Sequence, residues 1–190
     1  MSSRNNEVDV RDRILDAAAR FSTASTRRPP IAELARQAGV SRPTVYRHFG
    51  DSEAVFRALW EREIRRLAGG RPAQIETRSQ LVELVVDLAD KISTHESLAA
   101  SFAAEPELVA RYILARLGTG QRLLLDQLIE AITATQRDGT VRRGKPRELA
   151  AMTLLIAQSA IQSRQMIAEH LPESAWRREL ARALDGYLKP

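Results

Sequence analysis

The stretch IAELARQAGVSRPTVYRHFGDSEAVF, residues 31–56, decides the fold of this chain. In its first part, residues 31–38, apolar side chains recur on one face at helical spacing. Gly39 then supplies the backbone freedom that a sharp turn after a helix requires. Ser41 offers a side-chain oxygen as the N-cap of the next helix. The pattern predicts two short helices, 31–38 and 42–49, joined by a tight turn and followed by the start of a third.

The second of these helices is expected to have distinct inner and outer faces. Pro43 lies in its first turn, where a missing N–H costs nothing. Val45 and Phe49 are the expected inner residues. The outer residues combine hydrogen-bond donors, a cation and aromatic faces, and they are Arg42, Thr44, Tyr46, Arg47 and His48. A helix that lies in a DNA major groove requires this mixture, so the pair is predicted to be a helix-turn-helix DNA reader.

The run LARQAGVSRPTVYRHFGDSEAVF, residues 34–56, resembles the signature of the TetR family of bacterial transcriptional repressors. The segment AGVS followed by TVYRHF carries the resemblance. It implies an all-α fold in which an N-terminal three-helix helix-turn-helix head is joined by a fourth helix to a larger helical body for ligand binding and dimerisation. The DNA contacts that it implies are Ser41, Arg42, Pro43, Thr44, Tyr46, Arg47 and His48.

Two positions depart from the family pattern, and both concern phosphate. The family usually has Thr or Ser just before the first helix of the pair, where this chain has two prolines preceded by Arg27 and Arg28. Proline offers no side-chain acceptor, so we consider the two arginines as the replacement contact. The family also commonly has a phosphate-binding Lys where this chain has Ser52. We expect Ser52 to cap the helix that begins at Glu53, whose exposed amides suit a phosphate.

The charge of the chain fits a DNA-binding head. The net charge is only +5, but between residues 23 and 50 the charged side chains are five arginines and one glutamate. That excess is what a surface facing phosphates needs, although charge runs are more often plain solvated faces. With 44% hydrophobic but only 5% aromatic residues, the composition favours helices.

Several classes of protein are disfavoured. There is no cysteine, hence no disulfide framework and no thiolate site. No apolar run approaches the roughly 20 residues that span a bilayer, and the N-terminus lacks the apolar core of a signal peptide, so a cytoplasmic protein is expected. None of the three histidines sits in a metal-ligand pattern, and Asp87 and Asp90 are read as a solvated face rather than a catalytic pair. We therefore expect no enzyme, no metal and no cofactor.

Glycines and prolines divide the rest of the chain. Gly69–Pro72 is the predicted boundary, with a DNA-binding domain over residues 1–70 and an effector-binding and dimerisation domain over 71–190. Gly118 and Gly120 are expected to interrupt the helical pattern, and residues 138–146 to form a loop. The other predicted helices are 8–22, 52–68, 79–94, 121–135, 147–169 and 174–188, and a further helical pattern restarts at residues 105–106 and continues to residue 117.

The last two predicted helices are too broadly apolar for the surface of a monomer. The resemblance implies that they pack against their twofold mates as a four-helix bundle. The predicted interface consists of Leu155, Ile156, Ala157, Ala160, Trp176, Leu180 and Leu184. A helix-turn-helix protein independently favours a homodimer, because two recognition helices read half-sites roughly 34–36 Å apart or a multiple of that distance. The alternative for each residue is an ordinary intramolecular core.

The body is expected to bind a hydrophobic or amphipathic effector, since the candidate lining residues are mostly apolar or aromatic. They are Trp60, Phe102, Tyr112, Met152 and Ile156, with Gln158 and Gln165 as polar contacts, and each also suits a core position. The leading function is a ligand-responsive repressor that binds a double-stranded DNA operator. The alternatives are an activator or architectural DNA-binding protein without a ligand, and a helical binding or enzymatic module with an incidental helix-turn-helix pattern.

Overall fold

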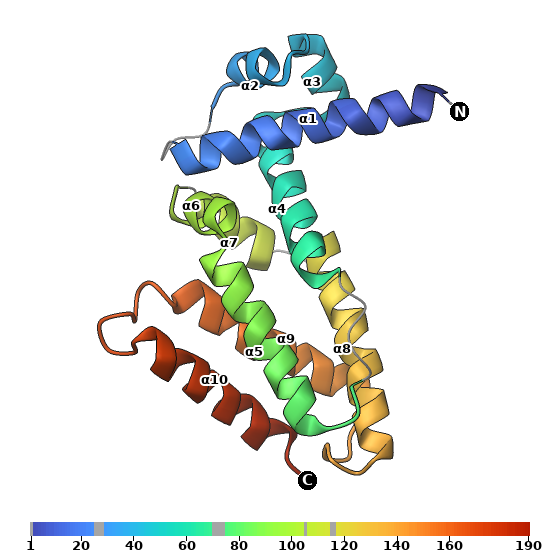
Figure 1. Ribbon diagram of the computed structural model, residues 1–190, viewed down its shortest axis with the longest axis vertical. Coiled ribbons are helices and arrows are strands. Elements are labelled where there is room, and N and C mark those ends of the chain that lie inside the picture. The colour runs from blue at the N-terminus through green and yellow to red at the C-terminus, as the bar shows by residue number, and fades with distance from the viewer. Residues whose placement is uncertain (1, 25–28, 70–74, 105, 115–116) are drawn as a thin grey trace. The chain divides into compact units, whose positions relative to one another are not determined.

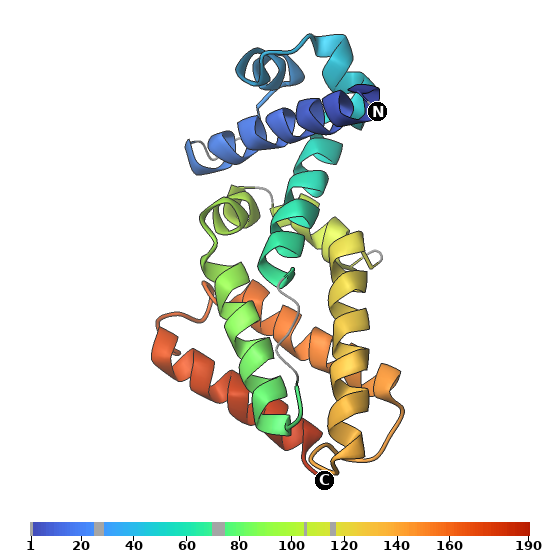
Figure 2. The same ribbon diagram turned by 45° about the vertical axis from the view of Figure 1, so that its right-hand side comes forward.

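The computed structural model describes residues 2–24, 29–69, 75–104, 106–114 and 117–190 (Figures 1 and 2). Over these residues the regular structure is entirely α-helical, as predicted. The helices in chain order are α1 (Ser2–Ala24), α2 (Ile31–Ala38), α3 (Arg42–Phe49), α4 (Ser52–Ala68), α5 (Arg78–Thr94), α6 (Glu96–Ala104), α7 (Pro106–Leu114), α8 (Thr119–Arg137), α9 (Pro146–Ser163) and α10 (Glu173–Leu188). In the described part, no helix combines the length and the apolar character that crossing a membrane demands.

The chain divides into two compact units that do not follow the predicted domain boundary. Met1–Ile64 and His95–Gly118 form the first, and Arg65–Thr94 and Thr119–Pro190 form the second. The first unit thus holds the helix-turn-helix together with α6 and α7. The second holds α5, α8, α9 and α10. The domain boundary after residue 70 stays a prediction, and the compact packing groups α6 and α7 with the helix-turn-helix.

The core of the first unit lies where α1 packs against α2 and α6. Ile14, Ala17 and Ala18 of α1 are fully buried and lie on one face at helical spacing. α1 begins at Ser2, earlier than the predicted start at Val8. The added residues carry no apolar stripe, which hid them from the periodicity. They also contain no Gly or Pro that would end a helix.

Helix α6 is not among the helices predicted from the sequence. Its sequence, ESLAASFAA, places small alanines on several faces, so no single apolar stripe marks it. Leu98 is fully buried, and the buried Ser101 hydroxyl donates to the Ser22 hydroxyl of α1 at 2.9 Å. This hydrogen bond satisfies both groups away from water and fixes α6 on α1.

The second unit is built on α8 and α9, which pack against each other as a helical hairpin. The loop between them falls at the predicted place and contains Gly139 and Gly144, both at positive φ. α5 packs against α9 and α10, and their apolar faces form the core. α9 ends at Ser163 rather than at the predicted Glu169, and turns follow over residues 164–170. The helical pattern of the sequence continues past this end, where Arg164 contacts Asp90 of α5 and the Trp176 ring of α10.

Candidate nucleic-acid interface

The turn between α2 and α3 is held from two sides. Gly39 adopts the left-handed conformation, with φ 63° and ψ 39°, and the Val40 amide donates to the Ala35 carbonyl at 3.0 Å. From α1, the Arg13 guanidinium donates to the carbonyls of Ala38 at 2.6 Å and Gly39 at 2.9 Å. The end of α2 is therefore tied both to its own backbone and to the scaffold helix.

The N-terminus of α3 is capped as predicted. The Ser41 Oγ accepts a hydrogen bond from the Thr44 amide at 3.3 Å and lies 2.8 Å from the Thr44 hydroxyl. Pro43 lies in the first turn. At the other end, Gly50 has φ 83° and its amide donates to the Tyr46 carbonyl at 2.8 Å. Caps at both ends give this short helix a defined position.

Most of the α3 residues predicted to meet DNA are exposed, but two of them, Thr44 and His48, are half-buried. Val45 is fully buried, whereas Arg42, Pro43, Tyr46 and Arg47 are exposed and Thr44 is half-buried. His48, predicted to point outward, is half-buried, and its Nε2 is buried with no hydrogen-bond partner among the described residues. The reason is spacing, because a residue three positions after a buried one shares its face of the helix.

Phe49 also differs from the prediction, because it is half-buried rather than fully inside. The guanidinium of Arg11 on α1 lies over its ring, 4.7 Å from the centroid. This cation–π contact covers the exposed side of Phe49 and joins the end of α3 to α1. The recognition helix therefore contacts α1 through an aromatic ring, in addition to its packing against α2.

The arginines of the head are not equivalent. Arg36 forms an ion pair with Glu33 on the same helix, with Nε 3.0 Å from Oε2, and this hydrogen bond lowers the pKa of the Glu33 carboxyl. The charge of Arg36 is therefore partly neutralised by Glu33, which makes Arg36 less available to a DNA phosphate. Arg27 and Arg28 lie outside the described residues. Arg42 and Arg47 are the cations that α3 itself exposes.

The start of α4 corrects the prediction for Ser52. The Asp51 carboxylate accepts from the Ala54 amide at 2.6 Å, so Asp51 and not Ser52 caps the helix. The Ser52 hydroxyl instead donates to the Pro29 carbonyl at 3.1 Å, which fixes the entry to α2. A carboxylate at this helix end competes with a phosphate for the same amides. A direct DNA contact of Ser52 stays a prediction. Pro30 precedes α2 without a side-chain cap, as predicted.

The predicted ligand-lining residues fall into separate groups. Trp60 of α4 is fully buried and meets Phe102 of α6 edge to face, with ring centroids 5.7 Å apart. Met152 and Ile156 lie together on α9, in the other compact unit. The structure thus brings these four together in pairs.

The polar members of the predicted ligand set are placed differently again. The Gln158 side-chain oxygen of α9 accepts from the amide nitrogen of Gln121 on α8 at 2.5 Å. Gln165 is exposed in the turns after α9. The side chain of Tyr112 lies outside the described part of α7. Gln121, which is buried, was not a candidate, because nothing in the sequence distinguishes it from a surface glutamine.

A groove of about 530 Å³ runs along α9 and α10, where the dimer interface was predicted. Its walls include Met152, Leu155, Ile156 and Ala160. Leu155 is 56% exposed and Met152 45%, so these side chains are available to a partner.

Four of the predicted interface residues are instead part of the chain's own core. They are Ala157, Trp176, Leu180 and Leu184. Leu184 has no exposed surface, because the apolar row of α10 turns inward toward α5 and α9. Trp176 and Leu180 also line the groove. For these four residues the alternative of an intramolecular core is therefore met, their part in a dimer interface stays a prediction, and the exposed apolar side chains of this region belong mainly to α9.

Comparison with known proteins agrees with this architecture. The model of the family described as bacterial regulatory proteins, tetR family, matches residues 14–59. Uncharacterized HTH-type transcriptional regulators of Mycobacterium bovis and Mycobacterium tuberculosis are each 39% identical over 189 residues, which is 99% of this chain and 99% of theirs.

Solved structures share the fold at low sequence identity. A Rhodococcus sp. protein assigned to the TetR family superposes with a TM-score of 0.70 and 20% identity, covering 96% of this chain and 100% of the other. The R. erythropolis transcriptional repressor QsdR, from the TetR family, gives a TM-score of 0.65 and 17% identity, with 94% of each chain covered. The matched relatives are transcriptional regulators and not enzymes. The exposed α3, the turn that holds it and the full-length match together place this chain in the TetR family of helix-turn-helix, DNA-binding transcriptional regulators.

Proposed function

We propose that this regulator is a ligand-responsive repressor, which binds a palindromic operator as a homodimer and leaves it when a small-molecule effector binds. The observation that carries the DNA-binding part is the exposed face of α3. That face presents donors, a cation and an aromatic ring on a helix whose two ends and whose preceding turn are fixed. A rigid reading helix loses little entropy when it enters a groove.

Arg42 is the proposed base reader. It is exposed at the first position of α3, and a guanidinium at that position can donate two hydrogen bonds to O6 and N7 of a guanine. Tyr46, which is 54% exposed, is proposed to contact phosphate. The buried Nε2 of His48 favours a supporting role for that side chain over the predicted phosphate contact.

A second copy of the chain is the proposed occupant of the α9–α10 groove. The groove is lined mainly by apolar side chains, and one of them, Leu155, is more than half exposed. A single α3 offers few base contacts, so two related by a twofold axis are needed for useful specificity. TetR-family proteins typically act as dimers, and this groove offers a surface for the contact.

The proposed switch acts through α4. Residues 52–64 of this helix belong to the first unit and residues 65–68 to the second, so α4 joins the two directly. Within the first unit, the buried Arg62 of α4 pairs with Asp16 of α1 at 2.8 Å. A displacement of α4 would therefore carry α1, and with it the turn that Arg13 holds. In a dimer, such a movement changes the separation of the two α3 helices.

A regulator without a small ligand, acting as an activator or architectural protein, is the alternative. It would share the DNA-binding surface and differ only in the response to an effector. Linkage separates the two, because an effector that weakens DNA binding must itself bind less tightly to the DNA complex by the same factor, typically about 5–150-fold.

The test begins with a band shift of the full-length protein on the DNA upstream of its own gene. We expect a specific shift that unlabelled upstream DNA, but not scrambled DNA, competes away. A panel of hydrophobic and amphipathic compounds is then titrated, and the affinity of each binder is measured with and without saturating operator. An unchanged affinity for every compound that binds would support the ligand-independent alternative, and the absence of a specific shift would contradict both.

A further inference from the structure

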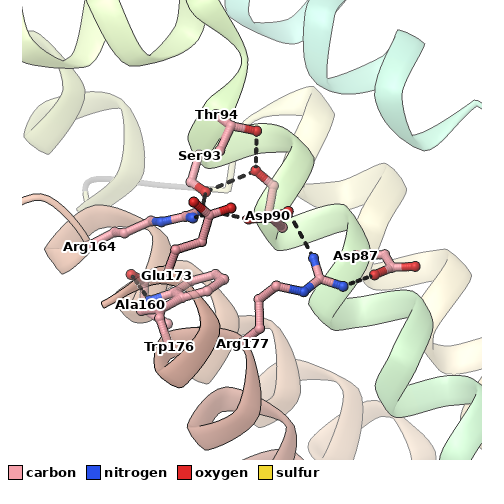
Figure 3. Close-up of polar contacts among 9 residues, drawn as sticks. All are labelled: Asp87, Asp90, Ser93, Thr94, Ala160, Arg164, Glu173, Trp176 and Arg177. Carbon is pink, nitrogen blue, oxygen red and sulfur yellow. Dashed lines mark hydrogen bonds and ion pairs between the residues drawn. The ribbon is translucent and has the colours of Figure 1, made fainter. Parts of the chain in front are cut away.

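Asp90 of α5 joins three segments of the second unit (Figure 3). Its Oδ1 accepts from Arg164, just after the end of α9, at 2.7 Å. Its Oδ2 accepts from Arg177 of α10 at 2.8 Å. One carboxylate thus contacts the segments on both sides of the α9–α10 connection. Asp90 is therefore not part of the solvated face that its spacing to Asp87 predicts, and the sequence does not show this because both arginines lie more than 70 residues away.

The ion pairs that Asp90 forms with Arg164 and Arg177, here called the Asp90 bridge, are partly buried. The side chain of Asp90 is 21% exposed and that of Arg164 is 15% exposed, so both charges are largely removed from water. Arg164 also donates to the Ser93 hydroxyl. Among the described residues, removing the carboxylate would leave Arg164 with only the exposed Glu173, 3.7 Å away, and Arg177 with only Asp87, so the two cations would lose the charge that they share. Removing one partner of a largely buried ion pair lowers the stability of the protein, because the other charge is left without compensation.

The α9–α10 corner is closed by an aromatic contact behind the ion pairs. The Arg164 guanidinium lies over the Trp176 ring, 4.5 Å from its centroid. The Trp176 indole N–H donates to the Ala160 carbonyl of α9 at 3.3 Å. Ala160 and Trp176 also line the α9–α10 groove. Arg164, which Asp90 binds, therefore contacts a residue that lines the groove.

We propose that Asp90 is a positioning residue for the subunit interface. Its charge holds α9 and α10 at the angle at which their groove accepts a second copy of the chain. The inference rests on the proposed dimer and adds to it a specific requirement, since the interface would depend on a charge that lies behind the groove and not in it.

The test compares dissociation constants of the dimer for the full-length protein by sedimentation equilibrium. Asp90→Asn keeps the shape and removes the charge, and it should raise the dissociation constant at least about tenfold. Asp90→Glu restores the charge and should recover most of the affinity. Asp87→Asn is the matched control, because Asp87 is 42% exposed and, among the described residues, forms an ion pair with Arg177 alone. It should change the dissociation constant less than about threefold.

Two further variants separate positioning from general stability. Val141→Ala removes methyl groups from the same core, away from the corner, and should lower the melting temperature while leaving the dissociation constant unchanged. Arg164→Lys keeps the charge but loses the planar contact with Trp176, and it should give an intermediate constant even if Asp90→Asn does not fold.

The outcomes distinguish this inference from the proposed dimer. If Leu155→Glu dissociates the dimer but neither Asp90→Asn nor Arg164→Lys weakens it beyond Val141→Ala, the positioning role of Asp90 is refuted and the dimer stands. If the wild-type protein is a monomer, or if Leu155→Glu leaves the dimer intact, the proposed interface itself fails and this inference fails with it.

Discussion

The turn between α2 and α3 depends on one glycine and one arginine. A Cβ placed on Gly39 would lie 2.8 Å from the Arg13 Nη2, and its φ of +63° is unfavourable for other residues. A non-glycine residue in this conformation costs about 1–2 kcal/mol, and displacing Arg13 would release the two carbonyls that it holds. The position therefore combines a backbone requirement with a tertiary one.

Gly39→Ala is expected to lower the free energy of unfolding by about 2 kcal/mol and to weaken DNA binding. Gly186→Ala is the matched control, because Gly186 is an exposed glycine inside α10 with open space at its Cβ. That substitution should stabilise the protein by about 1 kcal/mol through helix propensity. Chemical denaturation followed by circular dichroism measures both, and equal effects of the two variants would contradict this account of the turn.

One threonine hydroxyl in α9 is buried without a hydrogen-bond partner among the described residues. Thr153 is fully buried, and its Oγ1 has no hydrogen-bond partner among the described residues. An unsatisfied buried polar group costs about 1–3 kcal/mol. Thr135 of α8 is equally buried, but its hydroxyl donates to the carbonyls of Ala131 and Ile132. The two threonines are therefore equally buried, but within the described part of the chain only the hydroxyl of Thr135 forms hydrogen bonds.

Thr153→Val should accordingly raise the free energy of unfolding by about 1 kcal/mol, whereas Thr135→Val should lower it by a similar amount. Thermal and urea unfolding of the two variants under identical conditions give the comparison. Destabilisation by Thr153→Val would show that its hydroxyl has a partner in solution.

At the scale of elements, the α2–α3 pair was predictable to the residue because its signals are local. Gly39, Ser41 and Pro43 each act within a few residues of themselves, and the helix bounds follow from them. The start of α4 was less predictable, because Asp51 and Ser52 are both good caps. The choice is made by the Pro29 carbonyl, which takes the Ser52 hydroxyl and lies 23 residues away in the sequence. A contact between residues so far apart in the sequence cannot be predicted from local spacing.

The packing of α1 against α4 depends on a buried arginine. Arg62 has a side chain that is 10% exposed, and it contacts Asp16 at 2.8 Å and Glu63 at 2.9 Å. Arg111 of α7 pairs with Glu53 at 3.1 Å but is 65% exposed. Burial should make the first network matter much more than the second.

Arg62→Met is expected to destabilise the protein by about 2 kcal/mol, less than for a fully buried pair because Asp16 is half exposed. Arg111→Met should cost less than about 1 kcal/mol. Unfolding midpoints at low and high salt check the difference. If both arginines prove equally dispensable, α1 and α4 are not coupled in the way that the proposed switch requires.

At the scale of the molecule, the sequence predicted the family and the all-α fold but not which apolar faces remain exposed. Leu155 and Leu184 look alike in the periodicity, yet one is 56% exposed and the other is fully buried. Only packing decides between a chain's own core and a partner surface. The same limit applies to the ligand set, where Trp60 and Phe102 pair in one unit and Met152 and Ile156 lie in the other.

The exposed leucine on α9 provides the test of the dimer. Leu155→Glu places a charge in the groove and should convert the dimer to a monomer of 21.2 kDa at micromolar concentration. Leu84→Glu is the matched control, since Leu84 of α5 is 36% exposed but does not line that groove. Light scattering gives both masses. A dimer that survives Leu155→Glu would place the subunit contact elsewhere.

The measurement that tests the central claim most directly is DNA binding by Arg42→Ala beside wild type. Affinities for the operator, for operators with single base changes and for scrambled DNA are compared at one salt concentration, with Arg182→Ala on α10 as the control. We expect Arg42→Ala to lose roughly 1–3 kcal/mol on the operator and to stop discriminating one base position in each half-site, while Arg182→Ala behaves as wild type. Unchanged discrimination in Arg42→Ala would move the reading role to Arg47 or Thr44. Wild-type protein that binds operator and scrambled DNA equally would contradict the claim that α3 reads sequence.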